Sequence, residues 1–373
     1  MNFKIFTVKG IEVKLNISTL VIVALVGFYS ATFYSGLVQS TNLIELIIVG
    51  LINGFILLFS IVLHELMHSI MAQKYGLNVS EIELYLFGGV SKIEEDPKTP
   101  KSEALISVVG PLASLIFGAI LLTFFFFTQA LDPILYVTLF YSGLSNIVLG
   151  IFNFLPAFPM DGGRVLRSIL WKKRGDLLSA TKTASKTGKY IGYAMIGLGL
   201  LEMFLLGIIG GLWLAVMGYF LSSSAKKAYR QTKYTFQLSK IGAKSISKMP
   251  EITIPFGINV QQAIDEYFMK HRLSYFPVEK DDEIVGIITI KDVKEIPVAQ
   301  RDSQIIGYSM RKLSELPSIS ENDNGKDAFK QMQKTESRPR LVVVKSEDNS
   351  HVEGFIDEQE LSSAFQMSEL FSE

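Results

Sequence analysis

Long apolar stretches fill the first 225 residues of the chain, whereas polar and apolar positions mix in ordinary proportions after them. A membrane-spanning helix needs about 20 apolar residues to cross about 30 Å of hydrocarbon. Four stretches meet this length with few or no charged residues: 15–34, 46–71, 104–130 and 133–160. A fifth, 186–225, is too long for one crossing, and Glu202 with the glycines near it predicts a turn between two shorter crossings. The pattern therefore predicts about six transmembrane helices.

Composition supports this interpretation. Hydrophobic residues make up 49% of the 373 residues and charged residues only 19%, which is a high apolar share for a chain surrounded by water. The formal net charge is zero, so no basic field indicates a nucleic acid partner. The chain has no cysteine, which excludes disulfides and thiolate metal ligands.

Lysine and arginine predict the orientation of the spans, because cytoplasmic loops are enriched in these residues. With six spans, the loops near 35–43, 128–134 and 204–209 contain neither residue. All the basic residues of the other loops and of the segment before the first span fall on the opposite side. We therefore expect a multi-pass membrane protein with both termini in the cytoplasm.

The stretch "SIVLHELMHSI", residues 60–70, places three ionisable side chains inside the second predicted span. His64 and His68 are four residues apart, so they lie on one face of a helix and can share a cation. Glu65 follows the first histidine, where a carboxylate can accept a proton from an attacking water. The alternative is a histidine pair that hydrogen-bonds neighbouring helices while Glu65 is protonated. Ionisable groups inside a span are usually functional, which favours the metal site.

A catalytic zinc needs a third protein ligand, and the spans contain no further histidine. The stretch "NFLPAFPMDGGR", residues 153–164, offers Asp161 after two prolines that must break the fourth predicted helix. The alternative for Asp161 is an ordinary helix cap paired with Arg164. In the predicted topology, however, Asp161 and both histidines lie at a similar depth near the cytoplasmic surface. This agreement predicts a zinc site formed by His64, His68 and Asp161.

"HELMH" on one span and Asn153, Pro156, Asp161 and Gly162 on a later one resemble the motifs of the site-2 protease family of intramembrane zinc metalloproteases. The resemblance implies that His64, His68 and Asp161 bind zinc and that Glu65 is the general base. It also implies that Asn153 lies near the scissile carbonyl of a transmembrane substrate. "YLFGGVSK", residues 85–92, is similar to the glycine-bearing segment of this family, which implies membrane-associated strands with Gly88 and Gly89 contacting substrate.

An internal repeat follows in the second half of the chain. Residues 272–293 and 337–361 each predict two apolar strands around a polar turn and then the start of a helix, and an amphipathic helix precedes each of them. The unit resembles a tandem pair of CBS domains, which implies a regulatory module with clefts for adenine nucleotides such as ATP. Such pairs also associate face to face, so a homodimer is expected.

The nucleotide signal is confined to one repeat. "GIITIKD" supplies Gly286, Thr289 and Asp292, which the resemblance assigns to phosphate and ribose. The second repeat has Asp357 where the phosphate would lie, and its charge would repel that group. The alternative is a docking or dimerisation module in which Thr289 and Asp292 only cap a helix.

The sequence thus predicts a polytopic α-helical membrane protein of about six transmembrane helices with a short membrane-associated β segment and a C-terminal α/β tandem CBS module. We expect an intramembrane metalloprotease domain at 1–226, a linker at 227–245 and the CBS module at 246–373. The predicted function is zinc-dependent cleavage of a transmembrane segment. The alternative is a transporter or channel gated by the CBS module, since intramembrane histidine and glutamate can also relay protons.

Overall fold

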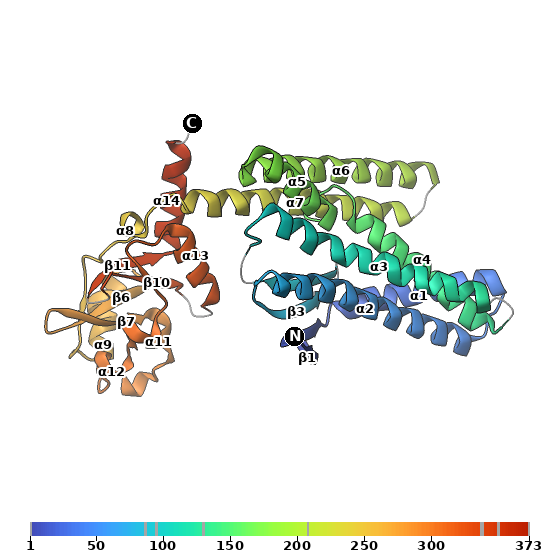
Figure 1. Cartoon of the computed structure of the whole chain (residues 1–373). Helices are drawn as coiled ribbons and strands as arrows, with labels where there is room; N and C mark the ends of the chain where they lie inside the picture. Colours follow the sequence, from blue (N-terminus) through green and yellow to red (C-terminus); the bar gives the residue numbers. More distant parts are fainter. Residues whose placement is uncertain are drawn as a thin grey trace. The chain divides into compact units, whose positions relative to one another are not determined.

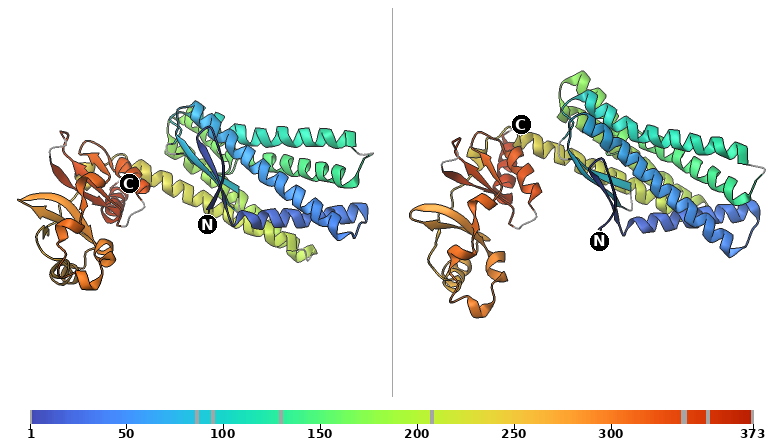
Figure 2. Two further views of the ribbon diagram at one scale, coloured as in Figure 1. Left: turned by 90° about the horizontal axis from the view of Figure 1, so that it is seen from below. Right: turned by 60° about the horizontal axis from the view of Figure 1, so that its bottom comes forward.

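The computed structural model describes residues 2–85, 88–93, 96–128, 131–206, 209–335, 339–348 and 351–371. It divides into two compact units, Met1–Tyr229 and Arg230–Glu373. Figures 1 and 2 show a helical first unit and a mixed α/β second unit.

Seven helices begin within the described residues of the first unit. They are α1 Thr19–Val38, α2 Leu43–Lys74, α3 Pro100–Thr128, α4 Pro133–Asn153, α5 Asp161–Arg174, α6 Leu177–Leu206 and α7 Ile209–Leu238, the last of which extends past the boundary between the units. Local signals account for several of their ends. Asn42 caps α2 by accepting a hydrogen bond from Ile44 N, and Asp132 does the same for α4 ahead of Pro133.

Four of the described helices, α1 to α4, are long and apolar enough to cross a membrane. Large side chains on them remain uncovered: Phe126 and Phe127 are 70% and 78% exposed. Exposed apolar side chains are unfavourable in water. In a bilayer they contact lipid tails, which are as apolar as the side chains themselves. The first helix begins at Thr19, not at residue 15 as predicted, because the preceding residues form a strand. The count of six spans stays a prediction.

Small and polar residues hold the spans together. Gly27 on α1 and Gly50 on α2 face each other so closely that a Cβ atom on either would lie 3.0 Å from the carbonyl oxygen of the other. Ser142 on α4 donates a hydrogen bond of 2.6 Å to the buried Asn53 on α2. Close backbone approach and interhelical hydrogen bonds of this kind are the usual basis of helix association in membranes.

The four strands of the first sheet pair in one layer. This sheet lies at one end of the helices (Figure 2). Its order is β1 Asn2–Val8, β2 Ile11–Asn16, β3 Val79–Tyr85 and β4 Gly88–Ile93. Apolar residues of β2 and β3 pack in one core with α2. The strands near 85–92 were predicted, although residues 86 and 87 lie outside the described part. The N-terminal hairpin, β1 and β2, was not predicted.

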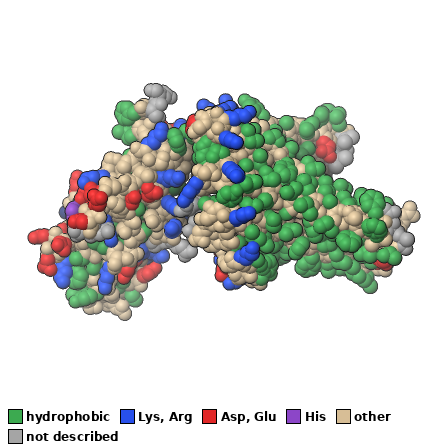
Figure 3. All heavy atoms as spheres, in the orientation of Figure 1, with side chains coloured by type: hydrophobic (Ala, Val, Ile, Leu, Met, Phe, Trp, Pro, Cys, Tyr) green, Lys and Arg blue, Asp and Glu red, His purple; other side chains and the backbone are tan. Residues whose placement is uncertain are grey.

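Hydrophobic and basic side chains occupy different parts of the surface of the first unit. Hydrophobic side chains cover most of its visible face over α2, α3 and α4, and lysine and arginine gather toward the end where β1 and β3 lie (Figure 3). This separation is what membrane immersion of the helices requires, with the basic end in water.

The second unit contains a repeated α/β arrangement. Its larger elements are β6 Tyr275–Lys280, β7 Glu283–Thr289, α11 Ile290–Glu295, α13 Gly325–Lys334, β10 Leu341–Lys345, β11 Val352–Asp357 and α14 Glu358–Leu370. Shorter ones are α8 Ala243–Ile246, β5 Ile254–Pro255, α9 Val260–Ala263, η1 Ile264–Phe268, α10 Met269–His271, η2 Val298–Gln300, α12 Ile306–Ser309, β8 Arg311–Lys312, η3 Leu313–Glu315 and β9 Ser318–Ser320.

Two sheets, β5-β6-β7-β8 and β11-β10-β9, correspond to the two predicted repeats. A shared core joins Ile287 of β7 to Val343 and Phe355 of the other sheet. Leu238, the last residue of α7, is fully buried in the core of the second repeat. Part of the predicted linker, 227–245, is therefore helical and packed.

Candidate metal centre and active site

The side chains of the two histidines of α2 lie next to each other. His64 and His68 are 6% and 5% exposed, and their Nε2 atoms lie 3.1 Å apart. Their rings are close to perpendicular, with centroids 4.8 Å apart. The i, i+4 spacing therefore brings the two donor atoms together as the sequence predicted.

Asp161 completes the group from a different part of the chain. Its Oδ2 atom lies 3.1 Å from Nε2 of His64 and 3.1 Å from Nε2 of His68. Four ligands at 2.0–2.1 Å from a tetrahedral zinc ion are about 3.3 Å apart. The three donor atoms thus fit a zinc ion and leave a fourth position for water or substrate.

The loop between α4 and α5 brings Asp161 to this position. The helix ends at Asn153, before the prolines that were predicted to break it, and Asp161 begins α5. A Cβ atom on Gly162 would lie 2.2 Å from the carbonyl oxygen of Phe154, and one on Gly163 would lie 2.2 Å from the nitrogen of Phe158. Only glycine fits where the loop folds back on the new helix.

The second nitrogen of each imidazole is also engaged. His68 Nδ1 lies 2.6 Å from the carbonyl oxygen of Ile106, which can only accept, so this nitrogen carries the proton and Nε2 is free to bind metal. His64 Nδ1 lies 3.0 Å from the hydroxyl of Ser114. Both partners are on α3. Such contacts orient the imidazoles of metal sites, and sequence reasoning missed them because nothing in a serine or a backbone carbonyl marks its role.

Glu65 lies beside the three donors and not among them. Its Oε2 accepts a hydrogen bond of 2.9 Å from Ser91 on β4, and Gly89 on the same strand packs directly against its side chain. A partly buried carboxylate next to the donor group fits the predicted role of a base.

Asn153 and Gly88, the other residues predicted to act on substrate, make no hydrogen bond to the three donor residues within the described part of the chain. Asn153 is the last residue of α4, and its amide donates to the carbonyl of Leu149 in its own helix. Gly88 begins β4 with φ of 123°, a conformation that favours glycine.

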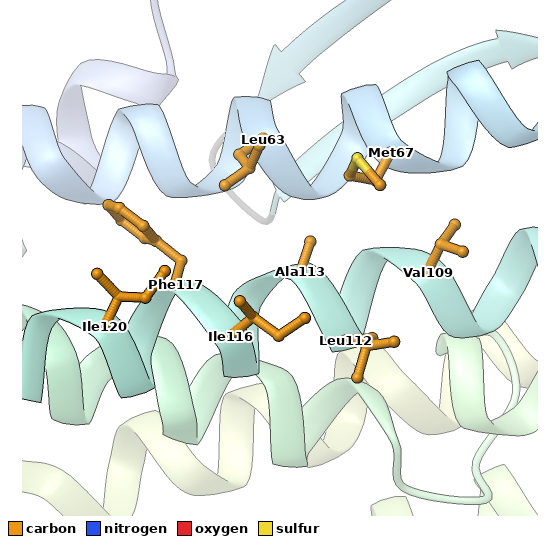
Figure 4. Close-up of a pocket in the computed structure, with 8 residues that line it drawn as sticks. All are labelled: Leu63, Met67, Val109, Leu112, Ala113, Ile116, Phe117 and Ile120. Carbon is orange, nitrogen blue, oxygen red and sulfur yellow. The ribbon is translucent and has the colours of Figure 1, made fainter. Parts of the chain in front are cut away.

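A groove of about 290 Å³ between α2 and α3 lies next to this site but is entirely apolar in its side chains (Figure 4). Its lining residues are Leu63, Met67, Val109, Leu112, Ala113, Ile116, Phe117 and Ile120. Leu63 and Met67 each precede a histidine, so they point about 100° away from the donor atoms around α2. The groove therefore faces away from the imidazoles of His64 and His68.

In the second unit, the predicted nucleotide residues form a helix cap. The hydroxyl of Thr289 accepts from Asp292 N, and the Asp292 carboxylate accepts from Thr289 N, which makes a capping box for α11. Arg311 donates to Asp292 Oδ1 through Nε and an amino group, at 3.0 and 2.6 Å. Gly286 has no room for a Cβ atom because the carbonyl oxygen of Arg311 would be 2.4 Å away. The role of Arg311 was not predicted.

Asp357 of the second repeat caps α14 in the same way, with Glu360 as its partner. Burial, together with the hydrogen bond to Asp357 and its negative charge, raises the pKa of Glu360 to about 7. Acidic groups therefore crowd the place where the second repeat would hold a phosphate.

Residues 53–137 and 128–199 match the model of peptidase family M50, and residues 243–299 and 304–366 match that of the CBS domain. Rip3 of Mycobacterium tuberculosis, named as a zinc metalloprotease, is 30% identical over 345 residues, which cover 90% of this chain and 86% of Rip3. The chain belongs to peptidase family M50. A zinc metalloprotease of Methanocaldococcus jannaschii is 35% identical to this M50 protein over 286 residues, or 73% of this chain and 80% of that one.

A solved site-2 protease from Methanocaldococcus jannaschii covers 61% of the M50 protein at 33% identity, with 95% of that chain aligned and a TM-score of 0.42. The family and its curated relatives make the protein a site-2-type metalloprotease of the membrane with a tandem CBS module. This decides between the two functions considered from the sequence, in favour of the protease and against the transporter or channel.

Proposed function

We propose that His64, His68 and Asp161 hold a zinc ion with which the protein hydrolyses a peptide bond inside a transmembrane segment of a substrate protein. The observation that carries this proposal is the meeting of the three donor atoms at 3.1 Å. The ion would act as a Lewis acid on the scissile carbonyl and lower the pKa of the attacking water to about 7.

Glu65 accepts the proton of the attacking water and delivers it to the leaving amine. Its carboxylate is on the same helix as two of the donors and, among the described residues, accepts a hydrogen bond from Ser91 at one of its two oxygens. Asn153 donates a hydrogen bond to the developing oxyanion after its amide turns from the carbonyl of Leu149.

The substrate has to unwind before it is cut, because a helix engages its carbonyl groups in its own hydrogen bonds. The sheet supports this step: among the described strands β4 pairs only with β3, so its other edge is available to an extended segment. Gly88 and Gly89 would lie against that segment. Substrate spans with Gly, Pro or Asn near the cut should be cleaved faster than the same spans with Leu there.

The topology proposed from the sequence has six spans and both termini in the cytoplasm, with the catalytic group towards that side. Its support is the gathering of basic side chains at one end of the helices (Figure 3). The division into a protease domain at 1–226, a linker at 227–245 and a CBS module at 246–373 stays part of this proposal, with α7 running through the linker as far as Leu238.

The test uses a panel of single-span membrane proteins whose spans carry Gly, Pro or Asn in the cytoplasmic half. The purified full chain should cleave at least one of them, Glu65→Gln should bind zinc normally with activity reduced at least a thousandfold, and Asp161→Ala should lose the metal. Full activity of Glu65→Gln would exclude the base assignment. Undiminished zinc binding by Asp161→Ala would exclude the ligand set.

The CBS module is proposed to regulate the protease by binding an adenine nucleotide near Gly286, Thr289 and Asp292, or by forming a homodimer. Asp292 already accepts from Arg311, so ribose would have to share or replace that partner. Calorimetric titration of the full chain with ATP should show heat for wild type that Asp292→Ala loses. Equal heats in both proteins would remove Asp292 from the site.

A further inference from the structure

The side chain of Glu65 is enclosed by two residues of the edge strand β4. Ser91 donates its hydroxyl proton to Glu65 Oε2 at 2.9 Å. A Cβ atom at position 89 would lie 2.2 Å from Cγ and 2.7 Å from Cδ of Glu65. Position 89 therefore excludes every larger residue unless the carboxylate moves.

A third residue fixes the direction of the Ser91 proton. Ser69 follows Glu65 by one turn of α2, is fully buried, and donates to Ser91 Oγ at 3.1 Å. A hydroxyl has a single proton to donate, so Ser91 accepts from Ser69 and gives its own proton to Glu65. The chain Ser69, Ser91, Glu65 holds one carboxylate oxygen and leaves the other, Oε1, for proton transfer.

We propose that Ser91 is a positioning residue for Glu65 and that Gly89 leaves the space its carboxylate occupies, so that β4 aligns the base. Hydrogen bonds between strands place neighbours about 4.8 Å apart. A substrate segment that pairs with the free edge of β4 would thus lie next to the strand that holds the base. Substrate binding and base alignment then depend on the same six residues, Gly88–Ile93. This inference rests on the proposed proteolysis.

The experiment measures kcat and KM on the test protein that wild type cleaves, with zinc content measured in parallel, for Ser91→Ala and Ser91→Thr in the full chain. Ser91→Ala should lower kcat about tenfold, the effect of losing one hydrogen bond to a charged group, with KM and zinc unchanged. Ser91→Thr keeps the hydroxyl and should recover most of the activity. Ser80→Ala, an exposed serine in the same sheet, is the matched control and should behave as wild type.

Gly89→Ala tests the second half of the proposal. The added methyl group should displace Glu65 and lower kcat at least tenfold at normal zinc content, whereas Gly36→Ala, where a Cβ atom would meet nothing within 4 Å, should have no effect. Ser91→Ala with wild-type kcat, or with zinc lost in proportion to activity, would overturn the role of Ser91. A Gly89→Ala protein that changes only KM would overturn that of Gly89.

Failure of this inference differs from failure of the proposed function. Normal proteolysis by Glu65→Gln removes both, because there is then no base to align. An inactive Glu65→Gln together with a fully active Ser91→Ala removes only the inference.

Discussion

The imidazole of His68 has almost no freedom to move. The carbonyl of Ile106 holds its Nδ1, Asp161 faces its Nε2, and Gly110 of α3 lies beneath the ring. A Cβ atom on Gly110 would be 2.2 Å from Nε2, the donor atom itself. Gly110 therefore leaves the space that the His68 ring occupies, although it offers no ligand atom.

Gly110→Ala should weaken zinc binding about 10- to 100-fold, the range seen when the surroundings of metal ligands are disturbed. The measurement is zinc affinity by chelator competition, followed by proteolysis at saturating zinc. Gly197→Ala, which would meet nothing within 4 Å in α6, is the control. Unchanged zinc affinity in Gly110→Ala would show that the ring can shift without cost.

At the scale of elements, an ion pair ties α5 to α3. Arg167 of α5 donates through Nε to Glu103 of α3 at 2.6 Å, and its guanidinium lies 4.8 Å from the ring centroid of Phe158. Glu103 is 1% exposed. The helix that begins with Asp161 is thereby attached to the helix whose Ile106 holds His68, so the ligands from distant segments keep their spacing.

Arg167→Met should destabilise the protein by about 3–5 kcal/mol, because Glu103 would be left as a buried charge without its partner. Adding Glu103→Gln should recover part of the loss. Thermal unfolding in detergent and zinc affinity are the measurements. Lys291→Met, which removes an exposed ion pair with Glu295, should change stability by less than about 1 kcal/mol. A loss for Arg167→Met as small as this control would contradict the role of the pair.

Across the whole molecule, each unit is built for a different solvent. In the first unit the spans expose phenylalanine and leucine and bury serine, asparagine and histidine between helices. In the second unit apolar cores lie against each sheet and between the two sheets, and charged residues remain outside. Detergent or lipid should therefore be needed to keep the first unit folded.

The raised pKa of Glu360 predicts a pH dependence of the second unit. Between its ordinary pKa of 4.5 and about 7, the group is ionised when unfolded but protonated when folded, so the free energy of unfolding falls as pH rises through this window. The loss is on the order of 1 kcal/mol, since solvent partly screens the group.

Hydrogen exchange of β10 and β11 in the full chain, corrected for intrinsic rates, would measure this effect at pH 5 and pH 8. Protection should be greater at pH 5 in wild type and should change less in Glu360→Gln. Equal changes in the two proteins would assign the pH dependence to other groups.

The sequence by itself determined the features that repeat locally: the apolar spans, the helical spacing of His64 and His68, and the two similar units of the CBS module. These depend on residues close in the chain, whose periodicity can be read directly. It also indicated Asp161, because a break after two prolines and a depth argument both pointed to it.

Only the tertiary structure decided which distant residues meet. Asp161 lies 93 positions from His68 and contacts it, the N-terminal hairpin joins β3, and Ser91, Gly110 and Arg311 gain their roles from neighbours far away in sequence. Such contacts depend on packing between elements, which no local pattern encodes, and an ordinary serine or glycine carries no mark of what will be placed beside it.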